Sequence, residues 1–180
     1  MSAPAAAQIR AAVVEDCDAL GRLHVRGWRE TYSGLMPEWV IERLTPAARS
    51  LQWRTGLERG AKGPIVFIAE AEDRSPAGFA AAGPARDPAY PWQAEIYAVY
   101  VLQRHQRQGL GRALLRQLGA ELAARERRQA GTWVLSANAP ARSFYEAIGA
   151  RAVHQRVDES EGWSCDETAY CWDDFPSALG

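Results

Sequence analysis

The chain has few cysteines and no long apolar segment. Its 180 residues include 3 cysteines, Cys17, Cys165 and Cys171, which form neither a CxxC pair nor an even set. We therefore expect reduced thiols in a cytoplasmic protein rather than a disulfide framework. The longest uncharged stretch, residues 129–141, is far shorter than the ~20 residues that a membrane-spanning helix needs, so no membrane association is expected.

An excess of one charge is absent as well. The net charge is −1 at pH 7, which gives no basis for generic binding to nucleic acid or to membrane surfaces. The sequence contains no HExxH motif and no Cys/His spacing typical of metal ligands, so no metal site is expected. Without repeats or a linker, residues 1–180 are expected to form a single domain, in which residues 1–7 are a flexible tail.

A strand that runs into a glycine-spaced turn and a helix is the most informative segment present. The apolar stretch 96–101 precedes the turn 106–112, and leucines at 110, 114, 118 and 122 give the following helix one buried stripe. Glycines at 109 and 111 allow the backbone to approach a ligand closely. Since the first amides of a helix lack intrahelical partners and carry the positive end of its dipole, we expect a phosphate site here.

Two familiar phosphate motifs do not fit this turn. Leu114 stands where a dinucleotide-binding fold needs its third small residue, and the Gly-Lys-Ser/Thr ending of a P-loop is absent. Taken alone, the glycine pattern is equally compatible with an ordinary turn between a strand and a helix.

Three motifs in order, however, resemble a known family. Gln-x-x-Gly-x-Gly at 106–111 resembles motif A of the GNAT superfamily, the acetyl-CoA-dependent N-acetyltransferases. A short apolar strand at 133–136, Asn138, and a helix that contains Phe144-Tyr145 and ends at Gly149 resemble its motif B. Residues 167–172 are similar to the last strand of the family, and the resemblance covers residues 8–175.

The resemblance implies an α/β fold. Its sheet would be mixed, mostly antiparallel and seven-stranded, with helices on both faces, and splayed between the motif A and motif B strands. Strands are expected at about 9–14, 65–71, 78–82, 93–102, 133–136, 151–158 and 164–173, and helices at about 16–32, 37–57 with an interruption near 45–46, 110–122 and 140–149. Asp16 is expected to cap the first helix. The final strand, if exposed, could pair two chains into a homodimer.

The resemblance also assigns roles toward acetyl-CoA. The pyrophosphate would bind the turn, formed by Gln106, Arg107, Gln108, Gly109, Leu110, Gly111 and Arg112. The backbone N–H of Val99 would contact the acyl oxygen, and the backbone of Val101 would pair with the pantetheine arm. Asn138 would also bind this arm, unless it is a plain helix cap. Tyr145 would contact the coenzyme and protonate the departing thiolate.

Acetyl transfer to an amine also requires the loss of a proton. Deprotonating a lysine-like amine at pH 7 costs about 4–5 kcal/mol, so a general base is expected. Glu95 lies eleven residues before Gln106, at the position of the family's glutamate base. Its apolar neighbours would desolvate it and raise its pKa, with proton transfer through water. The alternative is a solvated glutamate at the end of a strand.

The sequence defines the amine acceptor less well than it defines the coenzyme site. The resemblance places Trp28, Tyr32 and Glu95 at the acceptor. Nearby would lie the loop before the motif A strand, with Asp87, Tyr90 and Trp92, and the acids of the last hairpin, Asp158, Glu159 and Glu161. Aromatics with carboxylates suit a cationic amine, although the aromatics could equally be core and the acids solvated. We expect direct attack by a small primary amine, such as an amino acid or a polyamine. The alternatives are an acetyltransferase for protein lysines or N-termini and a non-catalytic CoA-sensing module.

Overall fold

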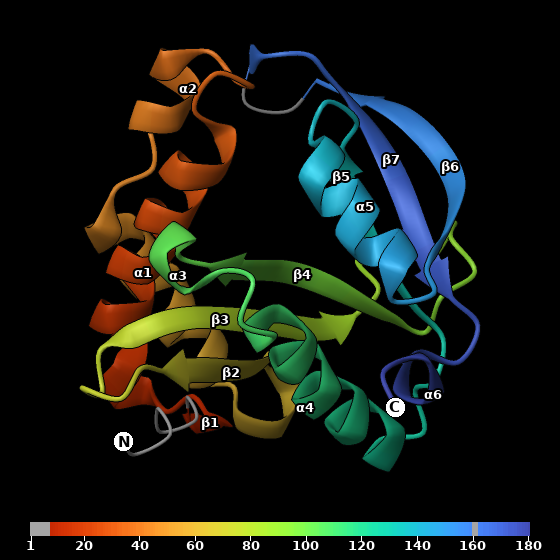
Figure 1. The fold of residues 1–180 in the computed structure, drawn as a ribbon, viewed down its shortest axis with the longest axis horizontal. Coiled ribbons are helices and arrows are strands. Elements are labelled where there is room, and N and C mark those ends of the chain that lie inside the picture. The colour runs from red at the N-terminus through yellow and green to blue at the C-terminus, as the bar shows by residue number, and fades with distance from the viewer. Residues whose placement is uncertain (1–7, 160–161) are drawn as a thin grey trace.

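The computed structural model describes residues 8–159 and 162–180, which form one seven-stranded sheet in the order β1-β2-β3-β4-β5-β7-β6 (Figure 1). The strands are β1 Gln8–Ala11, β2 Ile65–Glu70, β3 Pro76–Pro84, β4 Ala94–Val101, β5 Ala130–Leu135, β6 Arg151–Asp158 and β7 Cys165–Trp172. The α-helices are α1 Cys17–Tyr32, α2 Glu38–Glu42, α3 Pro46–Leu57, α4 Leu110–Ala124, α5 Ala139–Ala147 and α6 Phe175–Ala178.

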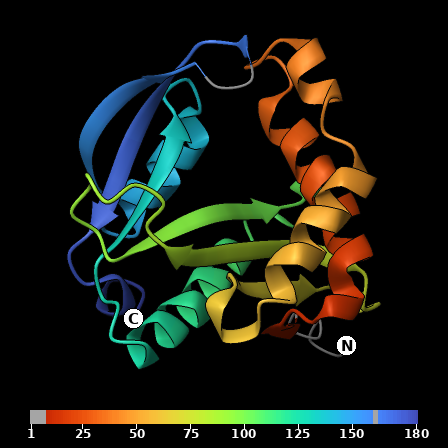
Figure 2. The ribbon, with the colours of Figure 1, turned by 180° about the vertical axis from the view of Figure 1, so that it is seen from behind.

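Helices cover both faces of the sheet. Helices α1 and α3 pack against one face of β2–β4, around a core that includes Leu20, Trp53 and Phe79. Helix α4 covers the opposite face, as Figures 1 and 2 show from the two sides. Its predicted stripe is confirmed, because the leucines at 110, 114, 118 and 122 are all buried.

The sheet opens between β4 and β5. These two strands run parallel and pair only at Ala94 with Ala130 and at Glu95 with Gly131, whereas all other neighbouring strands are antiparallel. Beyond these two pairs the strands diverge, which separates β2–β4 from β5–β7 in Figure 1. The predicted fold class is therefore confirmed, including the splay between the two motif strands.

A tryptophan fixes the point at which the splay begins. The indole of Trp92 lies directly over Gly131, so that a Cβ at this position would collide with the ring. Trp92 also stacks on Tyr90 and packs with Ala169 and Cys171. This residue, expected near the acceptor, is therefore part of the core that joins the loop before β4 to β5 and β7.

Several details differ from the sequence-based expectations. The carboxylate of Asp16 accepts hydrogen bonds from the Val13 amide and from Arg10, and does not cap α1. Helix α6 was not predicted. The final strand β7 lies between β5 and β6 and so has no free edge to pair two chains; the edge strands of the sheet are β1 and β6. The tail 1–7 and Glu161 lie outside the described residues.

Membrane spans, metal sites and disulfides were all expected to be absent. None of the described helices is long and apolar enough to cross a membrane. Within residues 8–159 and 162–180, no group of three or more His, Cys, Asp and Glu side chains is placed to hold a metal ion. The three cysteines are free, and burial raises the pKa of the Cys165 thiol to about 11.

Candidate active site

The turn between β4 and α4 presents unpaired backbone amides. Arg107 and Gly109 adopt left-handed conformations, with φ of 62° and 79°. In the part of the chain that the structure describes, no amide of residues 107–112 donates to a backbone carbonyl, and the first turn of α4 is closed only from Ala113 onward. Successive amides of this kind form a concave anion site, with the positive end of the α4 dipole behind it.

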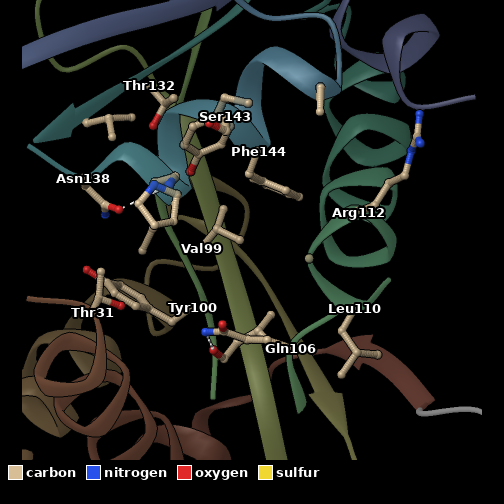
Figure 3. Close-up of a pocket in the computed structure, with 18 of the residues that line it drawn as sticks. Thr31, Val99, Tyr100, Gln106, Leu110, Arg112, Thr132, Asn138, Ser143 and Phe144 are labelled. Atoms are coloured by element: carbon tan, nitrogen blue, oxygen red, sulfur yellow. Dashed lines mark hydrogen bonds between the residues drawn. The ribbon is translucent and has the colours of Figure 1, made fainter. Parts of the chain in front are cut away.

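The second glycine and the glutamine hold this turn in place. A Cβ at Gly111 would lie 3.2 Å from the Phe144 ring, so the glycine allows α4 to approach α5 closely. The Gln106 side chain donates from Nε2 to the Val101 carbonyl at 2.9 Å, which ties the turn to the end of β4 (Figure 3). Of the two glycines, Gly109 is therefore needed for its backbone conformation and Gly111 for close packing.

The backbone of β4 changes its orientation partway along the strand. The Ile96 carbonyl accepts a hydrogen bond from Thr132 Oγ1 of β5 at 3.1 Å, so Ile96 faces β5. The Leu102 amide instead donates to the Ala77 carbonyl of β3 at 2.9 Å. Because backbone groups alternate between the two edges of a regular strand, both residues would face the same edge unless the strand held an extra residue.

Tyr97 is that extra residue. The register between β3 and β4 shifts at the step from Ala81 to Ala82, which leaves Tyr97 without a partner in a β-bulge. After the bulge, Val99 and Val101 direct their backbone groups away from β3 and into the splay. The hydrogen bond that the Val101 carbonyl accepts from Gln106 agrees with this orientation.

The splay encloses a cavity of about 620 Å³ between α1, β4, α4, β5 and α5 (Figure 3). Most of the residues predicted to bind the coenzyme line it. These are Val99, Val101, Gln106, Arg107, Gly109, Leu110, Gly111, Arg112, Asn138 and Tyr145. Tyr32, predicted to contact the acceptor, lines the α1 side. The residues of both motifs thus lie around one cavity.

Three tyrosine hydroxyls belong to the same cavity. Burial raises the pKa of Tyr145, an effect that Tyr32 reinforces and a hydrogen bond with Thr132 opposes. Burial likewise raises the pKa of Tyr100 and of Tyr32, whose hydroxyls are hydrogen-bonded to each other. All three hydroxyls are therefore protonated at neutral pH, and Tyr145 can act as a proton donor.

Asn138 combines the two roles considered for it. Its Oδ1 accepts a hydrogen bond from the Ala141 amide at 3.2 Å and so caps α5. The side chain is buried and lines the cavity, and among the described residues Nδ2 has no acceptor. The amide nitrogen is therefore available to a ligand while the oxygen holds the helix.

Glu95 is buried beside the cavity instead of lining it. Its Oε1 accepts from Nε and Nη2 of Arg86, and its Oε2 accepts from the Arg86 amide at 3.0 Å. An ionised carboxylate oxygen has about two acceptor positions, so one position on Oε2 remains for a water molecule.

Two further predicted residues do not line the cavity. Trp28 packs against Tyr32, with ring centroids 4.5 Å apart, and supports that wall from behind. The Gln108 side chain turns back to the Arg104 carbonyl. Side chains that the sequence did not single out complete the wall, namely Thr31, Tyr97, Tyr100, Thr132, Trp133 and Ser143. The bulge at Tyr97 interrupts the regular alternation of β4, so the sequence pattern did not report that Tyr97 and Tyr100 both line the cavity.

The comparison with known proteins gives the family. The Acetyltransferase (GNAT) family model matches residues 28–150, which include the turn, both splayed strands and Tyr145. The chain belongs to the GNAT family. YuaI of Bacillus subtilis (strain 168), named as an uncharacterized N-acetyltransferase, is 34% identical to this GNAT chain over 171 residues, which cover 95% of each protein. The chain is therefore an acetyltransferase.

Solved structures share the GNAT fold. The PaiA N-acetyltransferase from Thermoplasma acidophilum in complex with coenzyme A superposes with a TM-score of 0.70 at 20% identity, over 93% of this chain and 98% of that one. YncA, a putative acetyltransferase from Salmonella typhimurium with its cofactor acetyl-CoA, gives a TM-score of 0.69 at 23% identity, over 92% of both chains.

Proposed function

We propose that this GNAT protein transfers the acetyl group of acetyl-CoA to the primary amine of a small molecule, by direct attack in a ternary complex. The observation that supports this most is the splay itself. It joins a turn of unpaired amides, a free edge of β4 and an aromatic cavity in one continuous site. The coenzyme complexes of the fold neighbours add support, because both hold coenzyme A or its acetyl thioester.

The groups present fit acetyl-CoA along its length. The amides of residues 107–112 suit the pyrophosphate, and Arg107, Arg112 and His105 bring cationic or hydrogen-bonding side chains to the same wall. The free backbone of Val101 and the Asn138 amide suit the amide groups of the pantetheine arm, which would add to β4 like an extra strand. Bound there, acetyl-CoA supplies an activated thioester and a thiolate leaving group.

Two groups of this chain would then act on the reacting atoms. The Val99 amide faces the splay and would donate to the acyl oxygen as negative charge develops on it. The Tyr145 hydroxyl, kept protonated by burial, would give its proton to the departing sulfur. Both groups are fixed by secondary structure, one on β4 and one on α5.

The amine proton would leave through water to Glu95. The carboxylate is held in one orientation by Arg86, with one acceptor position on Oε2 available to that water. Trp28 and Tyr32 would form the α1 side of the acceptor site, with Tyr32 at the cavity and Trp28 behind it.

Two measurements test this function. Calorimetric titration with acetyl-CoA should give saturable binding, and a panel of small amines should give acetyl-CoA-dependent thiol release. No heat and no thermal shift at millimolar acetyl-CoA would contradict the proposal. Binding without transfer to any amine would support a CoA-sensing module, and transfer confined to peptides would support a protein acetyltransferase.

A further inference from the structure

Two arginines stack on aromatic rings that line the cavity, although neither arginine is itself among the lining residues. The Arg86 guanidinium lies 5.2 Å from the centroid of the Tyr97 ring, and that of Arg156 lies 4.0 Å from the centroid of the Trp133 ring. Tyr97 belongs to β4 and Trp133 to β5, so one cation stands on each side of the splay. Both rings line the cavity.

These cations lie on the sheet face opposite to α4 and α5. Tyr97 packs in the core on the α1 side, and Trp133 packs with Tyr90 and Trp92, whereas Val99 and Val101 pack toward α4. The two arginines are thus separated from the coenzyme wall by the strands themselves. A ligand that meets both of them enters from the acceptor side.

Each arginine has a carboxylate behind it, and in each pair the cation is the exposed partner. The Arg86 side chain is 63% exposed and Glu95 is 3% exposed. Arg156 is 35% exposed, while Glu167, which accepts from its Nε and Nη2, is 18% exposed. The guanidinium is therefore the more solvent-accessible member of each pair.

Both guanidiniums keep donors for a ligand. Each uses Nε and Nη2 on its glutamate, and among the described residues no acceptor is found for Nη1 of Arg86 or of Arg156. An arginine has five N–H donors, and their planar arrangement suits an oxyanion such as a carboxylate.

We propose that the acceptor carries a carboxylate beside its amine, and that Arg86 and Arg156 bind this carboxylate. The substrate class is therefore amino acids, and the polyamines first considered do not fit this side of the cavity. This inference rests on the proposed acetyl transfer. Glu95 and Glu167 act here as positioning residues, because they orient the two guanidiniums.

Matched acceptors test the proposal in the unmodified protein. For each amino acid in a panel, kcat/KM is compared with that of its α-amide and of a dipeptide in which the same residue is N-terminal. Since hydrogen bonds between charged groups stabilise a complex more than neutral ones, the free acid should exceed its amide by at least about 10-fold for the preferred side chain. Equal rates for acid and amide, or a preference for polyamines, would overturn the proposal, and a preference for dipeptides would point to protein N-termini.

Variants locate the carboxylate site. Arg156→Gln should raise KM for the free acid about 10-fold and reduce the ratio between acid and amide toward one. Arg151→Gln is the matched control, because Arg151 lies on the same strand but pairs with the exposed Asp173, and it should keep the full ratio. An unchanged ratio in Arg156→Gln would contradict the assignment.

Product binding separates this inference from the proposed function. Arg86→Gln/Glu95→Gln removes both charges of the buried pair, which avoids an isolated buried carboxylate. In the presence of CoA, the N-acetyl amino acid should bind the wild-type protein at least about 10-fold more tightly than its amide, and this difference should vanish in the double variant. Equal binding of both products by the wild type overturns the carboxylate site, whereas absent thiol release with selective product binding overturns only the transfer.

Discussion

On the α4 side of the splay the groups that face the cavity are mainly backbone, whereas on the α1 side they are side chains. The turn 107–112 and the β4 edge offer amides whose positions follow from local conformation. Tyr32, Tyr97 and Trp133 come from three separate elements, α1, β4 and β5, which only the fold brings together. Local conformation therefore positions the first set of groups, whereas tertiary packing positions the second.

The largest expected effect concerns the packing of the α1 side. His24 lies among Trp53, Phe79 and Tyr100, and burial lowers its pKa to about 3, with a smaller contribution from Arg49. The folded state holds the His24 ring neutral. The contribution of His24 to the free energy of unfolding is therefore fully present above the unfolded pKa of about 6.5 and is lost as the pH falls toward 3. Between pH 6.5 and 4 the free energy of unfolding should fall by about 2–3 kcal/mol on this account.

His24→Phe should show a shallower loss over the same range, measured by urea denaturation at several pH values. The substitution keeps a ring in this position and removes Nδ1, which has no partner among the described residues. Identical pH slopes in the two proteins would show that His24 does not set the acid sensitivity of the α1 side.

The next effect concerns proton removal. Glu95→Gln should lower kcat about 100-fold, as expected for the loss of a general base, with little change in the affinity for acetyl-CoA. If Glu95 only orients Arg86, the variant should instead raise KM for carboxylated acceptors and leave the pH profile of kcat as it was. Steady-state kinetics from pH 6 to 10 distinguish the two outcomes.

Tyr145→Phe should have a smaller effect, about 10-fold on kcat, because a thiolate is already a fair leaving group. Burial raises the pKa of Tyr145 above its usual value near 10, so the hydroxyl remains protonated throughout the working range. The loss should therefore be the same from pH 6 to 9. A loss that grows with pH would assign the proton to another group.

For the affinity toward acetyl-CoA, the backbone conformation of the turn should matter more than the side chain of Val99 does. Gly109→Ala imposes a left-handed conformation on a residue with a Cβ, which costs about 1 kcal/mol and should weaken acetyl-CoA binding about 5-fold. Gly34→Ala is the matched control, since Gly34 has φ of 81° and equally open surroundings but lies outside the turn. Equal effects of the two substitutions on acetyl-CoA affinity, measured by calorimetry, would contradict the assignment.

The smallest effect is expected for Val99→Ala. The proposed contact uses the Val99 amide, which the substitution retains, so KM for acetyl-CoA should change less than about 2-fold while the melting temperature falls slightly. A large rise in KM with an unchanged melting temperature would mean that the side chain itself contacts the ligand.

The same contrast determines how much the sequence could predict. Local periodicity and conformation predicted the leucine stripe from Leu110 to Leu122, the turn at Gly109 and the helix cap at Asn138. Each of these features lies within one short segment of the sequence. The pairing of Glu95 with Arg86 joins a strand to the loop before it, and that of Arg156 with Glu167 joins two strands. No periodicity reports such contacts.

Other misassignments have equally local causes. Trp92 was expected at the acceptor because it lies in the right loop, but the absence of a side chain at Gly131 lets its ring pack onto β5. Regular alternation alone would have misplaced the amides of β4, since the bulge at Tyr97 reverses which residues face the splay; the family resemblance, and not periodicity, assigned Val99 and Val101. Asp16 precedes α1 as a cap would, yet Arg10 binds its carboxylate.

The central claim is that backbone amides of β4 and of the turn bind the coenzyme. Amide hydrogen exchange measured by NMR with and without acetyl-CoA tests it most directly. In the complex, strong protection from exchange is expected for the amides of Val99, Val101 and residues 107–112, with little change at the β6 edge. Saturable binding of acetyl-CoA without added protection at these amides would contradict it.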